Sequence, residues 1–542
     1  MSTPITISAA SVGQISNPPA ESGSIQFGAN ATAASSIPYL NFSVALANEV
    51  HTYLLNKTSD VYFFSASSNW TTITSTQYST LGNAFIVAGL LQLYQATENQ
   101  TYLIWASGTS EQFWDHGWQG AGGFYDTYNS DWTQSSGCEE ILQDNALFEL
   151  DFLELHELNG SLLWMQRANA EEELLNAKFW DSSESIAEVG YVPCTGLQSG
   201  DVDIETSVGS YLWATGEWTA ISGNQSYMNR MNEVASFAEK YLWDGASNTL
   251  QGGPGSTDCG GPSGSLGFMR SVYANLTGLE DCRKGANENA WGAIGLAELY
   301  SLTGNKTILS WTDRDLTWIN DTLWDPTYGG YHNDVFRNDT LRSSCSSIDD
   351  AEDYPGWTQG EQPMLFWNIG QLTGNTTLMR WSLTAETWTV QHQWNYTDGN
   401  GGEMTCLNNG AIPDKGSPYL YDWVQASGIY SFSTIGSLEA SGSTSSTTTT
   451  KTASTSSGPT PSSTLGTTSS SSAAGPPANT SSSTSAASRT ALLWASVLYV
   501  AAVGAVIGSV GLVARITNKR RDRQRPNRSS ALAFRGHLKF RY

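Results

Sequence analysis

Residues 141–161, ILQDNALFELDFLELHELNGS, decide how this chain folds. The stretch begins with an acid and an amide, continues as a dense apolar body and ends in an Asn-Gly-Ser turn. Apolar side chains on most sides of a helical period indicate a helix that is buried nearly all round. An amphipathic helix, residues 161–180, follows at once. Together the two segments predict a helical hairpin.

The hairpin recurs along the chain. Relatives of its buried helix begin at Gly82, Ile204, Asn287, Gly360 and Tyr419. One hairpin cannot cover its own apolar surface, so such repeats must stack on their neighbours. The first helix, from Asn41, has no inner partner before it and the last inner helix has no outer partner after it, so these two ends form a sixth pair. The sequence predicts an all-α fold, an (α/α)6 toroid over residues 38–440.

The segments that flank this toroid have a different composition. Residues 1–37 are predicted to be disordered, and residues 441–489, nearly all Ser, Thr, Gly, Ala and Pro, to be a disordered O-glycosylated stalk. Residues 491–514 run for 24 positions without a charge, which predicts one transmembrane helix. Residues 515–542 hold ten Lys/Arg and one acid, so we expect a cytosolic tail and a single-pass type I protein of the plasma membrane.

Several features favour an exterior toroid. Its six cysteines show no CxxC spacing, which suits disulfides better than zinc, and fourteen N-glycosylation acceptors precede the apolar run. The first residues lack the basic and apolar regions of a secretory signal, and we give the apolar run and its basic flank more weight than this conflict. Without the tail the chain holds 16 Lys/Arg and 50 Asp/Glu, which disfavours nucleic acid as a partner.

The two faces of the predicted toroid differ in chemistry. The tight turns after the inner helices carry acceptor asparagines, so we expect glycans there; these are Asn99, Asn159, Asn224, Asn305 and Asn375. The long connections gather on the opposite face and contain all six cysteines. Because loops positioned by a rigid scaffold commonly carry function, we expect the functional site on this loop face.

Most inner helices begin on the loop face with acids, namely Asp144, Asp203, Glu205, Glu288, Glu361 and Asp422. A carboxylate in a first helical turn is also explained by capping and by the helix dipole. Convergence of several such acids on one cavity nevertheless favours a site. The substrate-binding candidates beside them are Trp118, Phe124, Tyr125, Asp126, Tyr331, His332, Trp357 and Trp423. Carboxylates beside aromatic rings suit a carbohydrate ligand, and any one of these rings can equally be a core residue.

The hairpin pattern, with its GGFYD and GGYHND loops, resembles the six-hairpin glycosidases, most closely glycoside hydrolase family 76, the α-1,6-mannanase-like enzymes. The resemblance implies a glycoside hydrolase or transglycosylase that acts on mannose-containing cell-wall or glycoprotein glycans. Members use two consecutive aspartates at the head of an inner helix as nucleophile and acid/base. Only Asp144 matches this pair, because Asn145 follows it.

The second acid therefore has several possible sources. The rim loops contain one consecutive pair, Asp349-Asp350, which a solvated acidic loop explains slightly better than a catalytic pair; alternatively Glu205 or Glu288 supplies the acid, or the activity is lost. An inactive toroid would be a carbohydrate-binding anchor or sensor. A sugar epimerase would require paired histidines, and only His332 lies in a rim loop. No motif implies a cofactor or a metal, and the oligomeric state stays open.

Overall fold

The computed structural model describes residues 39–67, 70–118, 122–135, 138–245, 248, 250–257, 259, 266–327, 329–341, 354–393, 406–408, 412–413 and 419–443. The expected disordered start, the span, the tail and all but the first three residues of the expected stalk lie outside these ranges. Within them, no helix combines the length and the apolar character that crossing a membrane requires.

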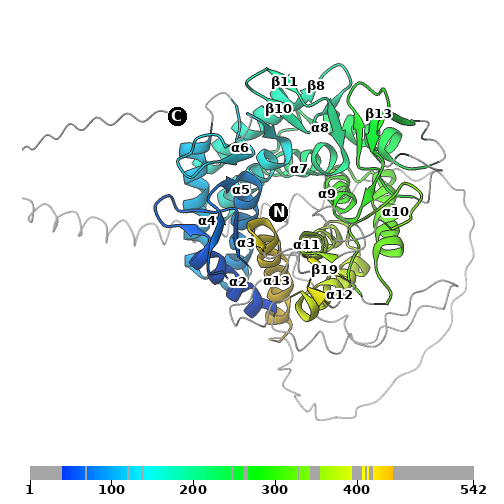
Figure 1. The fold of residues 1–542 in the computed structure, drawn as a ribbon. Helices are drawn as coiled ribbons and strands as arrows, with labels where there is room; N and C mark the ends of the chain where they lie inside the picture. Colours follow the sequence, from blue (N-terminus) through cyan, green and yellow to red (C-terminus); the bar gives the residue numbers. More distant parts are fainter. Residues whose placement is uncertain are drawn as a thin grey trace, which may run out of the picture. The chain divides into compact units, whose positions relative to one another are not determined.

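Six inner helices form a closed ring, as the repeat predicts (Figure 1). Each packs against the next and the last packs against the first. The inner helices are α3 (Thr80–Thr97), α5 (Leu142–Asn159), η4 with α7 (Ile204–Ser210 and Tyr211–Ser222), α9 (Ala286–Thr303), α11 (Gly356–Thr373) and α13 (Asp422–Ser443). η4 is a π-helical segment. The prediction of an (α/α)6 toroid is confirmed.

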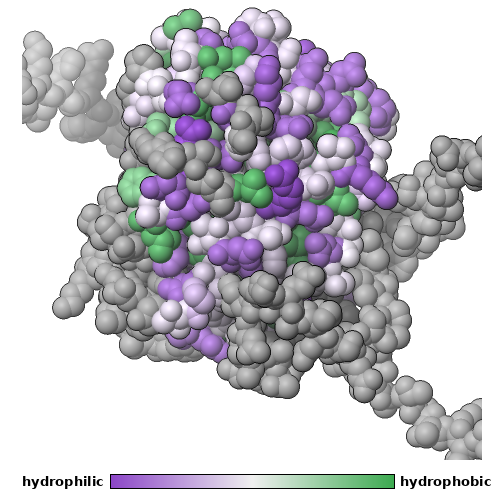
Figure 2. Space-filling view, turned by 90° about the vertical axis from the view of Figure 1, so that its right-hand side faces the viewer, coloured by the Kyte–Doolittle hydropathy of each residue, from purple (hydrophilic) through white to green (hydrophobic). Residues whose placement is uncertain are grey.

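The outer helices cover the ring, and each packs on an inner helix. They are α2 (Tyr39–Tyr53), α4 (Gln100–Gln112), α6 (Leu162–Leu174), α8 (Met228–Phe237), α10 (Lys306–Leu323) and α12 (Thr376–His392), and three of them end in π-helical turns, η2 (Phe113–Gly117), η3 (Leu175–Phe179) and η5 (Ala238–Leu242). One side of this unit, seen in Figure 2, is mostly hydrophilic with separate hydrophobic spots. This pattern suits a buried inner ring with a solvated exterior.

The tight turns from inner to outer helices share one construction. A residue in the left-handed conformation ends the inner helix, as Glu98, Gly223, Gly304 and others do. An Asn side chain then accepts the backbone N–H two residues further on, for example Asn99 from Thr101 at 3.1 Å and Asn305 from Thr307 at 3.0 Å. Such a cap satisfies a donor that the first helical turn leaves without a partner.

Short strands order the long connections on the loop face. The described strands form eight small sheets: β1–β2 (Leu55–Asn56, Val61–Tyr62); β11–β10–β7 (Leu197–Gln198, Gly190–Val192, Glu140–Ile141); β12–β14–β15–β13 (Asp201–Asp203, Ser271–Tyr273, Leu279–Asp281, Gly252–Thr257); β16–β17 (Lys284–Gly285, Asp334–Val335); β18–β19–β20 (Tyr354–Pro355, Cys406–Asn408, Ile412–Pro413); β21–β3–β4 (Tyr419–Tyr421, Ser65–Ser67, Ile73–Ser75); β5–β6 (Tyr78–Ser79, Thr127–Tyr128); and β8–β9 (Trp180–Asp181, Ile186–Ala187). All pairs are antiparallel except β13 with β15. Several strands lead directly into inner helices, so the sheets fix where those helices begin.

The ring closes between its first and last elements. Strand β21, just before α13, pairs with β3 near the start of the described chain. Helix α13 packs on α3 and α2, and Ser43 Oγ donates to the carbonyl of Ile429 at 2.8 Å. The expected sixth pair, built from the first outer and the last inner helix, is therefore present.

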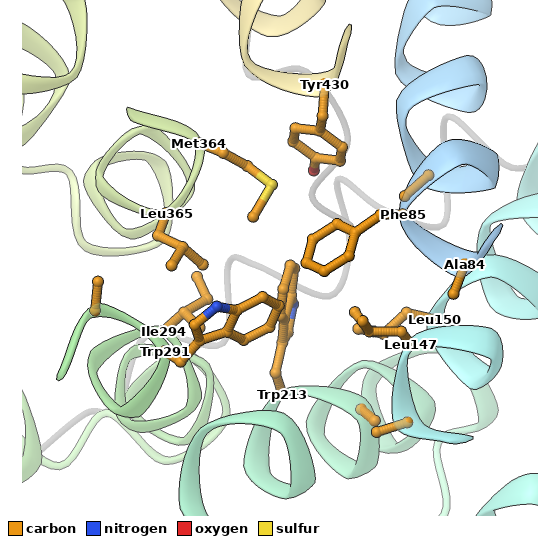
Figure 3. Close-up of a cluster of buried hydrophobic side chains, with 14 of the residues drawn as sticks. Ala84, Phe85, Leu147, Leu150, Trp213, Trp291, Ile294, Met364, Leu365 and Tyr430 are labelled. Atoms are coloured by element: carbon orange, nitrogen blue, oxygen red, sulfur yellow. The ribbon is translucent and has the colours of Figure 1, made fainter. Parts of the chain in front are cut away.

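An apolar plug fills the centre of the ring (Figure 3). Phe85, Leu147, Trp213, Trp291, Met364 and Tyr430 come from the six different inner helices and point toward one another. All are buried, and the small cavity between them has room for about one water molecule. The plug lies deeper in the ring than the first helical turns, so it forms the floor beneath the acids that head these helices.

Candidate functional site at the heads of the inner helices

An amide clamp repeats in the first turn of the inner helices and explains Asn145. Its Oδ1 accepts the backbone N–H of Phe124 at 2.7 Å, while Nδ2 donates to the carbonyls of Phe124 at 3.2 Å and Ile141 at 2.8 Å. Asn289 makes the same contacts with Phe268 and Gly285. Each amide therefore fixes the preceding loop onto its helix, a task that needs both a donor and an acceptor.

Two further hairpins carry the clamp. The side chain of Asn83 accepts the backbone N–H of Tyr62 and donates to its carbonyl, and Gln359 makes the same two bonds with Tyr331. All four amides occupy the fourth position of their helices, by the bounds given above. Asn145 is therefore a structural residue of this repeat. The clamp needs its amide at the position where the resemblance to family 76 implies a second aspartate.

The position before the clamp is acidic in two hairpins. Asp144 and Glu288 are the third residues of α5 and α9. Asp144 is only 2 % exposed, and its Oδ2 has no hydrogen-bond partner among the described residues. Burial, together with the charges of Asp126 and Glu139, raises the pKa of Asp144 well above its ordinary value. This carboxyl is therefore harder to ionise than an ordinary aspartate.

Three carboxyls from neighbouring inner helices lie close to one another. Glu205 comes from η4, Glu288 from α9 and Glu361 from α11. Glu205 Oε1 accepts from Gln143 Nε2 at 2.9 Å, which joins this cluster to the residue next to Asp144. Burial and the charges of Glu288 and Glu361 raise the pKa of Glu205 well above its ordinary value. We call these three residues the carboxyl cluster.

Glu361 has the environment of a proton donor. It is 4 % exposed, and its Oε2 accepts from the indole Nε1 of Trp291 at 2.7 Å. Burial raises the pKa of Glu361 to about 7, against the opposing hydrogen bonds from Trp291 and Asn287. A carboxyl that changes protonation near neutrality suits general acid catalysis.

Basic side chains border the cluster on one side. Arg270 Nε lies 3.7 Å from Glu288 Oε1, and Arg270 Nη1 lies 3.9 Å from Asp281 Oδ2. Arg283 binds Asp281 more closely, with Nη2 at 2.6 Å and Nε at 2.8 Å. Of the three clustered carboxyls, Glu288 is thus the one in an ion pair.

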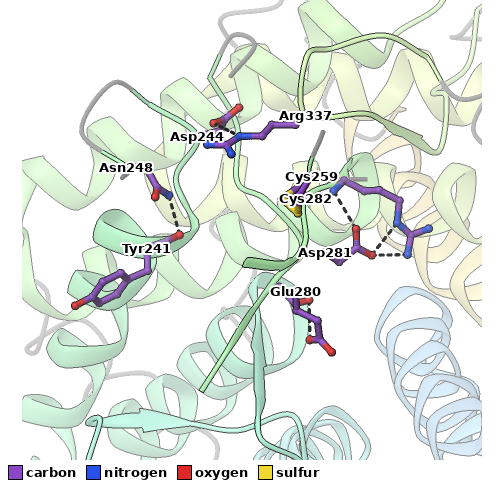
Figure 4. The surroundings of a disulfide bond; sticks show 10 residues. Tyr241, Asp244, Asn248, Cys259, Glu280, Asp281, Cys282 and Arg337 are labelled. Atoms are coloured by element: carbon purple, nitrogen blue, oxygen red, sulfur yellow. Dashed lines mark hydrogen bonds and ion pairs between the residues drawn. A yellow bond between two sulfur atoms is a disulfide. The ribbon is translucent and has the colours of Figure 1, made fainter. Parts of the chain in front are cut away.

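Disulfides and buried ion pairs hold the surrounding loops. Cys138 pairs with Cys194 and Cys259 with Cys282. Figure 4 shows the second disulfide beside Asp281, with the Asp244–Arg337 pair at 3.2 Å nearby. The expectation that disulfides pin the loop face is met for these four cysteines. Cys345 and the side chain of Cys406 lie outside the description.

The structure distributes the predicted aromatic residues between core and rim. Phe124 and Tyr331 are completely buried, because the amide clamp turns their loops inward, so their rings are packing residues. Trp118 stacks on Trp114 with ring centres 4.6 Å apart. Tyr125 is partly exposed and lies near Glu140, whose charge adds to burial in raising the pKa of Tyr125.

The other predicted residues have separate surroundings. Asp126 is exposed and acts electrostatically on Asp144. His332 is buried, with Nε2 at 3.6 Å from Asp325 Oδ2. The side chains of Trp357 and Trp423, which follow the first residues of α11 and α13, and the pair Asp349-Asp350 lie outside the description.

The sequence analysis named Glu361 as a helix-head acid but not as a catalytic candidate, and it missed Arg270, Gln143 and Trp291. Glu361 had a signal, since it heads an inner helix as the chosen acids do. Arg270 had none, because a single arginine in a long loop follows no periodic pattern. Within the described residues, no group of three His, Cys, Asp or Glu side chains has the arrangement of a metal site.

Comparison with known proteins identifies the architecture. A D-mannose isomerase matches with a TM-score of 0.59 at 12 % identity, over 74 % of this chain and 99 % of that one. The cellobiose 2-epimerase of Bacillus thermoamylovorans B4167 gives 0.57 at 11 % identity, over 72 % of this chain and 99 % of its own. The chain has the six-hairpin glycosidase fold.

The structure is also similar to those of glycosidases. A family 76 glycoside hydrolase from a bovine Bacteroides thetaiotaomicron strain matches with a TM-score of 0.54 at 12 % identity, over 74 % of this chain and 78 % of that one. No protein-family model and no curated protein sequence matches the chain. The likeness thus lies in the fold, and the chemistry must be argued from the residues.

Proposed function

We propose that the chain is a glycoside hydrolase or transglycosylase acting on mannose-containing glycans of the cell wall or of glycoproteins. The observation that carries the proposal is the carboxyl cluster at the heads of three neighbouring inner helices, with Asp144 on the next helix. Likeness to family 76 enzymes, and to an α-1,6-mannanase solved with α-1,6-mannotetrose, supports mannose as the sugar.

Glycosidic cleavage needs two carboxyls in different protonation states. One gives its proton to the oxygen of the leaving sugar, and an ionised one stabilises or attacks the anomeric carbon, or activates water. Glu361, with a pKa of about 7, and Asp144, whose pKa burial raises, suit the first role. Glu288, paired with Arg270, suits the second. The site thus contains groups for both halves of the reaction.

A second candidate is a toroid that binds glycans without cleaving them. One α-1,6-mannanase of this fold is inactive as a variant in which two consecutive aspartates are replaced. By the resemblance to family 76, Asp144 matches the first of two such aspartates, and Asn145, a clamp, follows it. This observation favours loss of activity unless a carboxyl from the cluster takes over the role.

An epimerase receives less support, although epimerases share the fold. The chemistry of an epimerase would require paired histidines at the centre of the ring. The five histidines that the structure describes have other partners: His51 stacks on Trp105, His116 on Trp132 and His392 on Trp388, His156 Nδ1 lies 3.0 Å from the carbonyl of Ser161, and His332 pairs with Asp325. The acids at the centre therefore favour glycoside cleavage.

An exterior location with one membrane anchor completes the proposal. It rests on the apolar run, the basic tail and the acceptor asparagines in the sequence. Protease treatment of intact cells should release a glycosylated fragment with the toroid and leave a small basic stub. A toroid that stays protected in intact cells would contradict the orientation.

The direct test separates binding from cleavage. The full-length protein in detergent is incubated with α-1,6-mannan, with a β-glucan as the control polysaccharide, and bound and released sugars are measured separately. We expect release from mannan only. Binding to mannan without release would favour the non-catalytic toroid, and neither binding nor release would remove mannan as the ligand.

A further inference from the structure

Arg270 is surrounded by acids from several elements. Its guanidinium lies 3.7 Å from Glu288 on α9 and 3.9 Å from Asp281 on β15. The charges of Glu205 on η4 and Asp203 on β12 also act on it, and although burial opposes them, these carboxylates raise the pKa of Arg270. Arg270 therefore keeps its charge at every pH at which the protein is folded.

Asp281 does not compete strongly for this charge. Arg283 Nη2 lies 2.6 Å from Asp281 Oδ2 and Arg283 Nε donates to the same oxygen at 2.8 Å. Arg283 also reaches Asp334 at 3.3 Å. Because Asp281 has a closer cation, Arg270 is available to Glu288, which has no other basic partner among the described residues.

The backbone holds Arg270 in place. Its carbonyl accepts the N–H of Ile204 at 3.0 Å, and its own N–H donates to the carbonyl of Arg283 at 2.8 Å. Ile204 begins η4, and Arg283 lies just before the strand that leads into α9. The residue is thus attached to both elements that supply the acids it faces, while its side chain remains 36 % exposed toward solvent.

Glu205 and Glu361 form no ion pair among the described residues, although the charge of Arg270 also acts on Glu205. Glu205 accepts from the neutral amide of Gln143, and Glu361 accepts from the indole of Trp291. Three clustered carboxyls repel one another when ionised, so the one beside a cation loses its proton first. Asp203 is already stabilised by the N–H groups of Thr206 and Ser207.

We propose that Arg270 is a positioning residue that holds Glu288 as the ionised carboxylate of the cluster and leaves Glu205 and Glu361 to carry protons. The inference rests on the proposed glycosidase function, which needs one ionised and one protonated carboxyl. The charged groups that face this pair are Glu205, Asp203, Glu361, Asp281, Arg283 and, beside Arg270, Glu280. Arg270 thereby determines which acid has which role.

The test compares Arg270→Gln, Arg270→Lys and a control, Arg380→Gln, which removes a charge from an exposed position on α12. In Arg270→Gln the acidic limb of the kcat/KM profile on mannan should move up by about one pH unit or more, because Glu288 loses its cation. Arg270→Lys should restore the limb, and Arg380→Gln should leave it unchanged. If Arg270→Gln folds and the acidic limb of its kcat/KM profile stays at the pH of the parent, the proposal is overturned.

Carbon-13 NMR of the glutamate side-chain carboxyls tests the same inference without turnover. In the folded full-length parent at neutral pH, the resonance that Glu288→Gln lacks should have the chemical shift of a carboxylate. The shift of a protonated carboxyl for that resonance would overturn the proposal, even if Arg270→Gln fails to fold. If mannan is not cleaved but the carboxylate shift is found, the glycosidase proposal fails and the charge assignment stands.

Discussion

Asn145 and Phe124 are joined through both main-chain groups of Phe124, with Oδ1 to N–H at 2.7 Å and Nδ2 to the carbonyl at 3.2 Å. An aspartate at position 145 could not donate to the carbonyls of Phe124 and Ile141, and one of its carboxylate oxygens would lie close to both carbonyl oxygens. We expect Asn145→Asp to cost about 2–3 kcal/mol of unfolding free energy without raising activity. Denaturant unfolding and mannan release measure the two effects.

Asn289→Asp is the matched control for this prediction, because Asn289 makes the same clamp with Phe268 in another hairpin. Similar losses of stability in the two variants identify both positions as structural. A stable Asn145→Asp protein that is more active than its parent would show that this position accepts a second catalytic acid.

Asp144 should affect turnover more than stability. Asp144→Asn keeps the size of the buried carboxyl but removes the proton that it can transfer. If Asp144 is catalytic, we expect turnover to fall about 10² to 10⁴-fold, roughly 3–5 kcal/mol of barrier. The unfolding free energy should change by about 1 kcal/mol at most. Turnover and melting temperature are measured on the same preparation, and unchanged turnover would exclude Asp144 from the site.

Glu361 should determine the alkaline limb of activity. Its pKa of about 7 means that the proton it donates is lost as the pH rises through neutrality, so kcat/KM should decline above about pH 7. Glu361→Gln keeps an acceptor for Trp291 Nε1 and should reduce the rate about 10² to 10⁴-fold. The control is Glu386→Gln, a buried acid on α12 that binds Ser431 at 2.9 Å. Equal effects of both substitutions on the rate would point to general destabilisation.

Stability should fall as the pH rises from about 5 to 8. Burial raises the pKa of Glu172 to about 7 and that of Glu154 to about 8. The ordinary pKa of Glu in an unfolded chain is about 4.3, so the folded state binds more protons across this range. We expect the melting temperature to be roughly 5 °C or more higher at pH 5 than at pH 8. Calorimetry at constant ionic strength checks the sign, and Glu154→Gln should flatten the slope.

Glycans should be attached to the turn asparagines and absent from Asn320. The five turn residues, Asn99, Asn159, Asn224, Asn305 and Asn375, each accept the N–H two residues further on. Asn320 belongs to the same acceptor pattern but is 4 % exposed on α10. Enzymatic glycan removal in heavy-oxygen water followed by peptide mass spectrometry should label the turn positions and leave Asn320 unlabelled. Unlabelled turn asparagines in the cell-derived protein would contradict an exterior toroid.

The fold was predictable because its signal is local and repeated. Each buried helix shows its apolar period within about twenty residues, and the Asn turn marks its end. The short strands were not predictable, since a pair such as β21 with β3 depends on a neighbour hundreds of residues away. An aromatic residue in a Gly-rich loop likewise does not reveal whether it faces the core, as Phe124 does.

The site was predictable in part. Position at a helix head led to Asp144, Glu205 and Glu288, of which Glu205 and Glu288 lie close together. The roles of these acids depend on partners from other hairpins. Sequence order does not place Arg270 beside Glu288. The clamp did leave a signal, because Tyr62–Asn83, Phe124–Asn145 and Phe268–Asn289 are all separated by 21 residues.

Ring closure has a consequence for synthesis. Ser43 and Ser433 share a hydrogen bond of 2.6 Å across 390 residues of sequence. Until α13 has left the ribosome, the surfaces of α2 and α3 that it covers have no partner, and contacts between such distant segments form slowly. The nascent chain therefore exposes apolar helix faces for most of its translation, and such exposed surface favours aggregation until the ring closes.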